Sequence, residues 1–314
     1  MTRQGPVPAL PLVPGSGLKP ITAADRELFD GFLRAQEHEL AEYAFQDIYV
    51  WKGLFDIRWQ LIRGCLSVFF SDASGSFLYL PPLGPVDAAV VEEAFGVLDS
   101  LNANPALSRI ENVEENSLAF FSGLGYRHCL RGHEYIYSRT EMAALSGNRF
   151  KSKRACVNYF AGNNRFEYRR YVPSFAEECV GLYETWMAAR AVGPTGEKDN
   201  VYRGMLSDGL NCLRVMLADY ESLGMEGALL LIKGKVVAFT FGYPITDRMF
   251  CVLFEVAHPE AKGAAQYIFR DFCAGAKGYR RINCMDDSGL ENLKRVKMSY
   301  RPSRLAPAYI INAH

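Results

Sequence analysis

One order of predicted elements occurs in both halves of this sequence, and it limits the fold more than any other feature. In each half, three apolar runs separated by short glycine or polar turns are typical of a meander of strands. A helix, a strand, a second helix and a last strand follow. The predicted ranges are 57–62, 65–70, 77–80, 86–101, 109–113, 116–124 and 135–138 in the first half, and 228–232, 236–243, 249–256, 264–276, 281–284, 290–297 and 308–312 in the second.

The second helix of each half ends in a small residue followed by tyrosine and arginine. These closures are Gly125-Tyr126-Arg127 in the first half and Ser299-Tyr300-Arg301 in the second. Identity between the halves is otherwise negligible, so the pattern indicates a repeat of topology and not of sequence. A coincidence within a generic mixed chain is the alternative interpretation.

We therefore predict an α+β protein with two similar domains, each a mixed, mostly antiparallel sheet flanked by helices. A chain of 314 residues is long enough for two ordinary domains. We place them at 21–140 and 141–314, the second opening with helices over about 175–191 and 200–218. Residues 1–20 carry five prolines. Such a segment is predicted to be a flexible leader that forms neither helix nor sheet.

Composition excludes several classes of protein. The 35 Lys and Arg residues balance the 35 Asp and Glu residues, so any nucleic-acid or phosphate site must be local. None of the eight cysteines forms a C-x-x-C pair, which favours buried thiols in a reducing compartment and no metal site. Neither an apolar run of membrane-spanning length nor an export signal is present, so we expect a cytoplasmic protein.

Residues 116–126 (NSLAFFSGLGY) resemble the closing motif of the GNAT acyltransferases. In that superfamily an asparagine starts a helix that ends in an aromatic residue, a Leu-Gly pair and the aromatic residue that begins the next strand. Gly125 suits the end of the helix, where a left-handed backbone is common. The resemblance implies that both predicted domains are GNAT-like.

Several segments are similar to a narrower group, the phosphatidylglycerol lysyltransferase C-terminal domain family. This resemblance covers about residues 25 to 312 and implies aminoacyl transfer from an aminoacyl-tRNA to a lipid head group, on a tandem GNAT scaffold. The sequence lacks the multi-span membrane domain of those enzymes and is similar to the stand-alone soluble branch, which leaves a small-molecule, peptide or lipid head-group acceptor open. The similar segments are 47–51, 83–85, 150–154 with Asn158, 254–255, 262–263 with Gln266, and 283–290 with Leu293, Lys297, Ser299, Tyr300 and Pro302.

A basic stretch spans residues 149–170, where seven Lys and Arg residues stand against one acid, Glu167. Cations interleaved with aromatic residues suit the phosphates of tRNA, coenzyme A or a lipid head group. A solvated helix face is the alternative. The candidate phosphate ligands here are Lys151, Lys153, Arg154 and Asn158.

Glu255 interrupts the apolar strand Val252-Leu253-Phe254-Glu255-Val256. Burying a carboxylate is costly unless it is paired or wet. In GNAT proteins this strand splays from its neighbour and the acyl donor enters the gap. Glu255 is therefore our candidate general base, with a pKa raised by desolvation. A structural salt bridge to Lys262 or Lys297 is the alternative.

The turn after this strand occupies the position where GNAT proteins hold pyrophosphate on backbone N–H groups. Lys262 and Gly263 are candidate phosphate ligands there, although the glycine pattern fits only in part, which weakens coenzyme A as donor. The first half has three prolines over residues 80–85 at the same position. Since proline lacks an N–H donor, we place the activity in the second half.

Four further candidates follow the strand predicted at 281–284. Asp286 and Asp287 either cap the next helix or recognise the amine of an aminoacyl group or acceptor. Lys297 is a candidate phosphate ligand. Tyr300 occupies a place where GNAT proteins often keep a general acid, although Tyr126 matches it in the other half. That match favours a structural role for the tyrosine at least as much.

The sequence thus favours a GNAT-type transferase that moves an aminoacyl group from aminoacyl-tRNA to an amine or hydroxyl. Two alternatives are an N-acyltransferase that uses acyl-coenzyme A and a non-catalytic module that holds a nucleotide or peptide. No tightly bound cofactor is expected, and coenzyme A or acyl-coenzyme A would act as a co-substrate. The sequence leaves the oligomeric state open.

Overall fold

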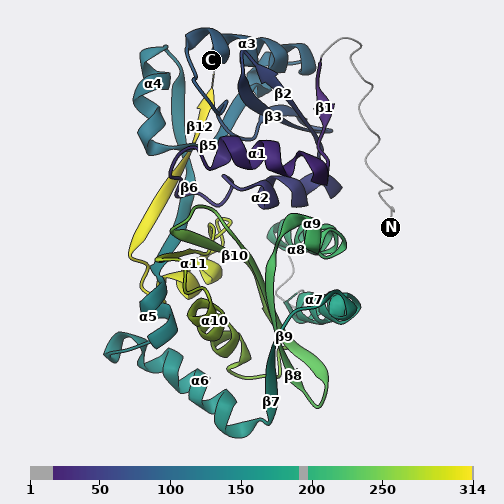
Figure 1. Cartoon of the computed structure of the whole chain (residues 1–314), viewed down its shortest axis with the longest axis vertical. Coiled ribbons are helices and arrows are strands. Elements are labelled where there is room, and N and C mark those ends of the chain that lie inside the picture. The colour runs from purple at the N-terminus through teal and green to yellow at the C-terminus, as the bar shows by residue number, and fades with distance from the viewer. Residues whose placement is uncertain (1–16, 191–196, 313–314) are drawn as a thin grey trace. The chain divides into compact units, whose positions relative to one another are not determined.

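The structure is a computed structural model that describes residues 17–190 and 197–312, without the side chains of 197–199. The chain forms two compact units (Figure 1). Unit 1 comprises Met1–His133 and Ala306–His314, and unit 2 comprises Glu134–Leu305. Within the described residues the fold is of the predicted α+β class.

The sheet of unit 1 has the strand order β1-β2-β3-β4-β5-β12. Adjacent strands of this sheet are antiparallel except β4 and β5, which pair in parallel with Leu78 opposite Ile110. The strands are β1 (Lys19–Pro20), β2 (Asp56–Ile62), β3 (Cys65–Asp72), β4 (Gly75–Leu78), β5 (Arg109–Glu114) and β12 (Arg304–Asn312), and the α-helices are α1 (Arg26–Leu33), α2 (Phe45–Val50), α3 (Ala88–Leu101) and α4 (Leu118–Gly123).

Helix α3 shows why this part of the sequence folds as it does. Asp87 caps the helix by accepting a hydrogen bond from the backbone N–H of Val90 at 2.9 Å. Val91, Ala94 and Leu98 lie on one face and are fully buried in the core of unit 1. Burying a side chain of the size of Val or Leu stabilises a fold by roughly 1.5–3 kcal/mol.

The leader prediction fails where the structure describes it. Lys19 and Pro20 form a short strand that pairs antiparallel with Trp59 and Arg58 of β2. Proline is tolerated here because β1 is the edge strand. Order therefore begins before residue 21, and residues 1–16 of the predicted leader lie outside the described residues.

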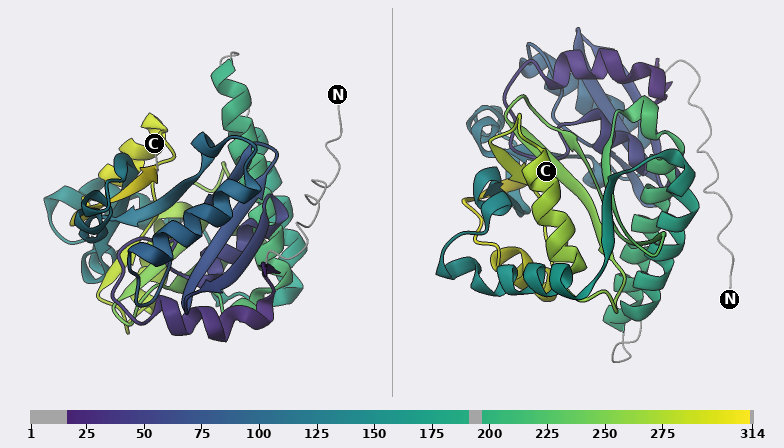
Figure 2. Two further views of the ribbon diagram at one scale, coloured as in Figure 1. Left: turned by 90° about the horizontal axis from the view of Figure 1, so that it is seen from above. Right: turned by 60° about the horizontal axis from the view of Figure 1, so that its bottom comes forward.

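The sheet of unit 2 has the strand order β6-β11-β10-β9-β8-β7. In Figures 1 and 2, α10 covers one face of β8–β10 while α7 and α8 lie on the other face. The strands are β6 (Arg127–Ser138), β7 (Phe166–Arg170), β8 (Glu226–Ile232), β9 (Lys235–Pro244), β10 (Met249–Ala257) and β11 (Arg281–Asn283), and the α-helices are α5 (Arg139–Ala144), α6 (Lys151–Asn163), α7 (Ala176–Arg190), α8 (Glu197–Ala218), α9 (Tyr220–Leu223), α10 (Ala264–Gly275) and α11 (Glu291–Met298).

The basic stretch contains an element that the sequence pattern did not reveal. Residues 166–170 form β7, which pairs antiparallel with β8 from Phe166 opposite Ile232 to Arg170 opposite Ala228. High charge hid the strand, because an edge strand with one exposed face tolerates charged side chains. Five of the seven cations therefore lie on α6 or β7, and Arg149 and Arg165 lie just before these elements.

The closing strands of the two halves do not stay with the halves that precede them. The last strand, β12, pairs antiparallel with β5 and lies mainly in unit 1. The end of β6 pairs antiparallel with β11 in unit 2, with Ser138 opposite Arg281. The contiguous boundaries predicted at 140 and 141 thus differ from the observed units, because strand pairing between distant segments leaves no local sequence signal.

Two kinds of feature are absent from the described residues. No helix there has both the length and the apolar character needed to cross a membrane. No group of three or more His, Cys, Asp and Glu side chains in that part of the chain is arranged to hold a metal ion.

Candidate active site

The candidate site lies in unit 2 where two parallel strands separate. β10 pairs with β11 from Met249 opposite Arg281 to Cys251 opposite Asn283. β11 ends at Asn283, whereas β10 continues to Ala257. Beyond Cys251, β10 therefore has no ladder partner on the β11 side among the described residues. This is the splay that the sequence predicted beside Glu255.

A β-bulge in β10 directs Glu255 to one face of the sheet. The register with β9 runs from Val252 opposite Gly242 to Phe254 opposite Phe241, so Leu253 is the extra residue. Because a bulge shifts the alternation by one residue, Glu255 lies on the same face as Val252. Val252 belongs to the core cluster that contains Tyr300 and residues of α10. The bulge thus brings the carboxylate to the α10 face.

Glu255 is an ionisable group without a bonded partner. Water reaches its side chain, yet desolvation by the surrounding protein raises its pKa to about 7, against the smaller opposing effects of Lys153 and Lys297. No described residue forms a hydrogen bond or an ion pair within 4.0 Å with it. The predicted alternative, a salt bridge to Lys262 or Lys297, is not formed among these residues.

Lys153 of α6 brings a cation near the Glu255 carboxylate. Its Nζ atom lies 4.0 Å from the ring centroid of Tyr300, which is a cation–π contact. Desolvation lowers the pKa of Lys153, while Glu255 is one of the charges that raise it. The lysine is half-buried, and so it is the cation of the basic stretch that faces the candidate base.

Tyr300 follows α11 and is 7% exposed. Its ring contacts Phe269 of α10, with 5.1 Å between the centroids. Burial and then the charge of Glu255 raise the pKa of Tyr300, so the phenol stays protonated at neutral pH. Within the described part of the chain, its hydroxyl has no hydrogen-bond partner. The phenol can therefore donate a proton or a hydrogen bond to a bound molecule.

Lys297 anchors the loop that follows β11. Its ammonium group donates to the carbonyl oxygens of Cys284, Met285 and Asp286, with 3.2 Å to that of Met285. Its own carbonyl accepts a hydrogen bond from Tyr137 at 2.9 Å. The ammonium group of Lys297 is therefore bonded to the loop, and its positive charge affects the pKa of Glu255 without a direct bond.

The two aspartates of this loop do not cap α11. The N-cap residue is Leu290, and no side chain bonds the first turn. Asp287 accepts hydrogen bonds from the N–H of Gly289 at 3.0 Å and from the hydroxyl of Tyr135. Asp286 accepts from the N–H of Ser288 at 3.1 Å. The capping alternative is thus wrong, and Tyr135, which no motif had singled out, orients Asp287.

Three other candidate residues of the basic stretch are exposed or make their contacts away from Glu255. Lys151 and Asn158 are exposed on α6. Arg154 donates from Nη1 to the carbonyl oxygens of Leu145 and Gly147, at 2.6 Å to the second. Since Leu145 ends α5 in a left-handed conformation, Arg154 satisfies carbonyls at that helix end.

Gly263 lies at the N-cap of α10 with φ +86°, against the backbone of α6. A Cβ atom built there would lie 2.2 Å from the carbonyl oxygen of Cys156. The glycine is therefore required by helix packing. The Nζ atom of neighbouring Lys262 lies 4.8 Å from the ring centroid of Tyr159. With α6 this close, the start of α10 has less room for a pyrophosphate.

The corresponding part of unit 1 is filled by the protein's own groups. Asn112, which is fully buried with φ 54°, donates from Nδ2 to the carbonyl oxygen of Tyr79 at 2.9 Å. The Tyr79 hydroxyl donates to Asp47. Leu83 then pairs back with Leu66 of β3. These bonds occupy the end of β4, where unit 2 has its splay.

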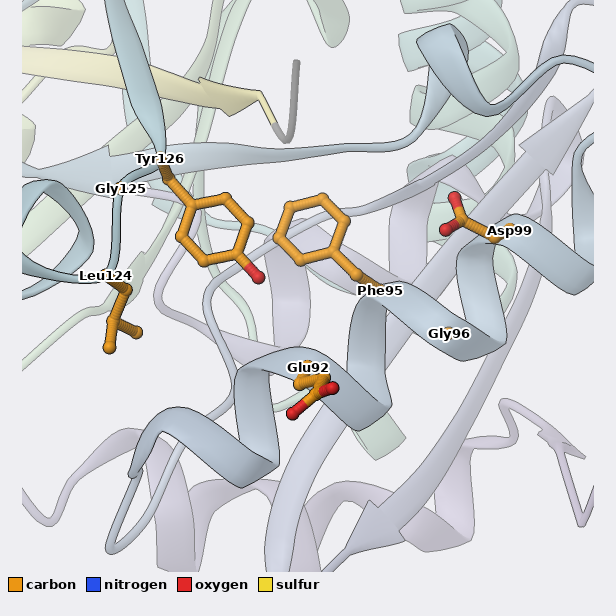
Figure 3. Close-up of a pocket in the computed structure, with 7 residues that line it drawn as sticks. All are labelled: Glu92, Phe95, Gly96, Asp99, Leu124, Gly125 and Tyr126. Carbon is orange, nitrogen blue, oxygen red and sulfur yellow. The ribbon is translucent and has the colours of Figure 1, made fainter.

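Unit 1 has instead a pocket on the outer side of α3 (Figure 3). Its volume is about 430 Å³. It is lined by Glu92, Phe95, Gly96 and Asp99 of α3 and by residues 124–126. None of the predicted site residues lines it.

Two units of this topology define a GNAT-type transferase fold in tandem, and the second unit has the splayed parallel strand pair with a carboxylate beside it. The sequence matches the family described as "Phosphatidylglycerol lysyltransferase, C-terminal" over residues 34–312. The chain therefore belongs to the phosphatidylglycerol lysyltransferase C-terminal domain family.

Solved structures share this fold. A conserved protein of unknown function from Bacteroides thetaiotaomicron VPI-5482 has a TM-score of 0.83 and 26% identity, covering 94% of this chain and 98% of that one. L-PGS from Bacillus licheniformis has a TM-score of 0.65 and 17% identity over 92% and 91%. FemX has a TM-score of 0.61 and 11% identity over 94% and 96%. No curated protein matches the sequence.

Proposed function

We propose that the protein transfers an aminoacyl group to an amine or hydroxyl acceptor and that unit 2 carries the reaction. The main support is Glu255, a carboxylate with a pKa of about 7 and no bonded partner among the described residues, at the point where β10 leaves β11. A general base works best when its pKa lies near the working pH. Family membership favours the same class of reaction.

In the proposed step, the Glu255 carboxylate takes a proton from the attacking amine or hydroxyl. The nucleophile forms a bond to the ester carbonyl carbon of the donor, and the bond from that carbon to the ribose oxygen breaks. The leaving oxygen takes a proton from the Tyr300 hydroxyl, which regains it from protonated Glu255. Lys153, whose ammonium lies 4.0 Å from the Tyr300 ring centroid, supplies positive charge near the developing oxyanion.

We favour aminoacyl-tRNA over acyl-coenzyme A as donor. The usual pyrophosphate position is the start of α10, and the carbonyl of Cys156 lies against the N-cap glycine there. The exposed cations Lys151 and Arg165 provide positive charge along α6 and before β7. We assign the acceptor only by its nucleophile, because the described residues around Glu255 show no feature that would select a lipid, a peptide or a small molecule.

The donor is tested by direct binding of bulk aminoacyl-tRNA, coenzyme A and acetyl-coenzyme A to the full chain. We expect aminoacyl-tRNA to bind, and binding to weaken in Lys151→Glu with Arg165→Glu, two exposed positions. Arg154 is unsuitable for this test because it holds the carbonyls at the end of α5. Glu141→Lys, which adds positive charge on α5, is a control that should not weaken tRNA binding. Binding of coenzyme A alone would show that acyl-coenzyme A, and not aminoacyl-tRNA, is the donor. Binding of neither class would refute both transferase hypotheses.

A further inference from the structure

The outermost strands β1 and β7 differ in how well their free edges are protected against pairing. β1 in unit 1 is two residues long and ends in Pro20, which offers no N–H group. β7 in unit 2 runs over Phe166–Arg170, contains no proline and pairs with β8 residue for residue. Among the described residues, β7 therefore has a regular outer edge of backbone donors and acceptors without a neighbouring strand.

The ladder with β8 fixes which backbone groups of β7 point outward. The N–H of Tyr171, just past the strand, donates to the carbonyl oxygen of Gly227 at 2.9 Å. The register of β7 and β8, continued by one residue, places these two residues opposite each other. In an antiparallel ladder, such hydrogen-bonded residues alternate with residues whose backbone groups face away. Phe166, Tyr168 and Arg170 therefore present their N–H and C=O groups at the outer edge.

The side chains of this edge carry opposite charges in an ordered arrangement. Glu167 and Arg169 are exposed and form an ion pair, with 3.2 Å between Oε1 and Nε. The guanidinium group of Arg169 also lies 5.7 Å from the ring centroid of Phe175, a cation–π contact. Because side chains alternate along a strand, the two charges share one face, and Tyr168, which is 37% exposed, lies on the other. The edge thus carries an acid and a base on either side of a central tyrosine.

We propose that β7 pairs antiparallel with β7 of a second copy of the chain, with the two Tyr168 residues opposite each other. In this register Phe166 of each copy lies opposite Arg170 of the other, so the outward-facing residues exchange backbone hydrogen bonds. Glu167 of each copy lies opposite Arg169 of the other, and two-fold symmetry repeats this pair. Opposite charges at opposed positions stabilise antiparallel strands, and like charges destabilise them. The edge is therefore complementary to itself, which favours a second copy over any other partner.

Charge reversal on β7 tests this pairing through the mass of the full chain. We expect sedimentation equilibrium to show a reversible dimer for wild type. Arg169→Glu places two acids opposite each other at both positions and should raise the dissociation constant of the dimer at least about tenfold. Adding Glu167→Arg to that variant restores opposite charges and should restore the dimer. Glu184→Arg is the control, because it reverses one charge of the exposed Glu184–Arg214 pair on α7 and α8 and should leave the dimer unchanged.

Hydrogen exchange of the backbone amides tests the register separately. In a monomer the amides of Phe166, Tyr168 and Arg170 exchange quickly because they face solvent, whereas those of Glu167 and Arg169 are protected by β8. In the proposed dimer all five amides are protected. Protection of the first three should fall on dilution and in Arg169→Glu, while continued protection of the other two shows that the strand is still folded.

Three outcomes would overturn the proposal. One is the mass of a single chain for wild type at every concentration. Another is a dimer in which the three outward-facing amides still exchange quickly. The third is a dimer that Arg169→Glu and Glu184→Arg weaken equally. Glu255→Gln should dimerise as wild type does, so these results are independent of the proposed transferase reaction.

Discussion

The two units share one topology and differ in what occupies the end of their parallel strand pair. In unit 2, β10 leaves β11 after Cys251, and Glu255 lies beside the separation. In unit 1, Asn112 bonds the backbone of Tyr79 at the corresponding place, and the chain returns to pair with β3. A duplicated fold can therefore keep one copy open for chemistry while the other copy closes the same position with its own side chains.

The same contrast appears around the repeated tyrosine. Tyr300 has the Lys153 ammonium over its ring and Glu255 among the charges that raise its pKa. Tyr126 has the acids Glu92 and Asp99 instead. One scaffold thus places a tyrosine beside a positive group in unit 2 and beside two acids in unit 1.

The largest expected effect is that of Glu255→Gln on transfer. Glutamine keeps the size of the side chain and cannot accept a proton, so we expect the rate of aminoacyl transfer to fall at least about 100-fold. Single-turnover rates with charged tRNA would measure this. Asp47→Asn, a change at a buried carboxylate of unit 1, is the matched variant and should change the rate little if it folds. A rate within a few fold of wild type for Glu255→Gln would rule out the base.

Gly263→Ala should destabilise the protein by roughly 3 kcal/mol. The added Cβ would meet the carbonyl oxygen of Cys156 at 2.2 Å, and the backbone is left-handed at φ +86°. Gly234→Ala has a similar φ of +78° with open space around it. That control should lose only about 1 kcal/mol. Urea denaturation of both variants measures the difference, and equal losses would show that α6 does not press on the start of α10.

Replacing each repeated tyrosine with phenylalanine compares the units directly. Tyr300→Phe removes the hydroxyl that we assign to the leaving oxygen and should slow transfer about tenfold, toward the low end of acid–base effects. Tyr126→Phe removes the equivalent hydroxyl in unit 1 and should leave the rate unchanged. Both rings keep their aromatic neighbours, Phe269 and Phe95. A similar slowing by both variants would assign the tyrosine a structural role in each unit.

The smallest expected effect is that of pH on the stability of the variant Glu255→Gln. The pKa of Glu255 rises from 4.5 to about 7 on folding, so the native state binds this proton more tightly than the unfolded state. Its contribution is present below pH 4.5 and is lost as pH rises through 7. As pH rises from 5 to 8, the free energy of unfolding of Glu255→Gln should therefore increase relative to that of wild type. The expected increase is about 1 kcal/mol, a small value because water screens the carboxylate. Denaturant midpoints of both proteins at pH 5 and pH 8 measure the difference. An advantage of the variant at pH 5 that disappears at pH 8 would contradict the prediction.

Much of the fold was predictable because local patterns carry it. The meanders, α3 and α10 followed from apolar spacing and turn residues, and the Tyr-Arg closures revealed the repeat. The pairing of β12 with β5 in unit 1 and of β6 with β11 in unit 2 was not predictable, since pairing between distant strands has no local sequence signal. β7 was missed because its charged edge residues do not resemble a strand.

The site was predictable in its residue types and less so in its arrangement. Glu255 stood out as a carboxylate in an apolar run, and Lys153 lay in the basic stretch. Their alignment depends on the bulge at Leu253, which no residue pattern marks. Arg154 and Lys297 were predicted as phosphate ligands, whereas the structure shows their donors on backbone carbonyls. Such bonds depend on chain turns that only the folded protein specifies.

The titration of Glu255 itself tests the central difference between the units most directly. In protein labelled with ¹³C at the glutamate δ-carbon, Glu255→Gln identifies the signal by its disappearance. We expect that carboxyl to titrate with a pKa of about 7, because the surrounding protein raises it above the ordinary value. A midpoint near the ordinary value of 4.5 would contradict a poised base in unit 2.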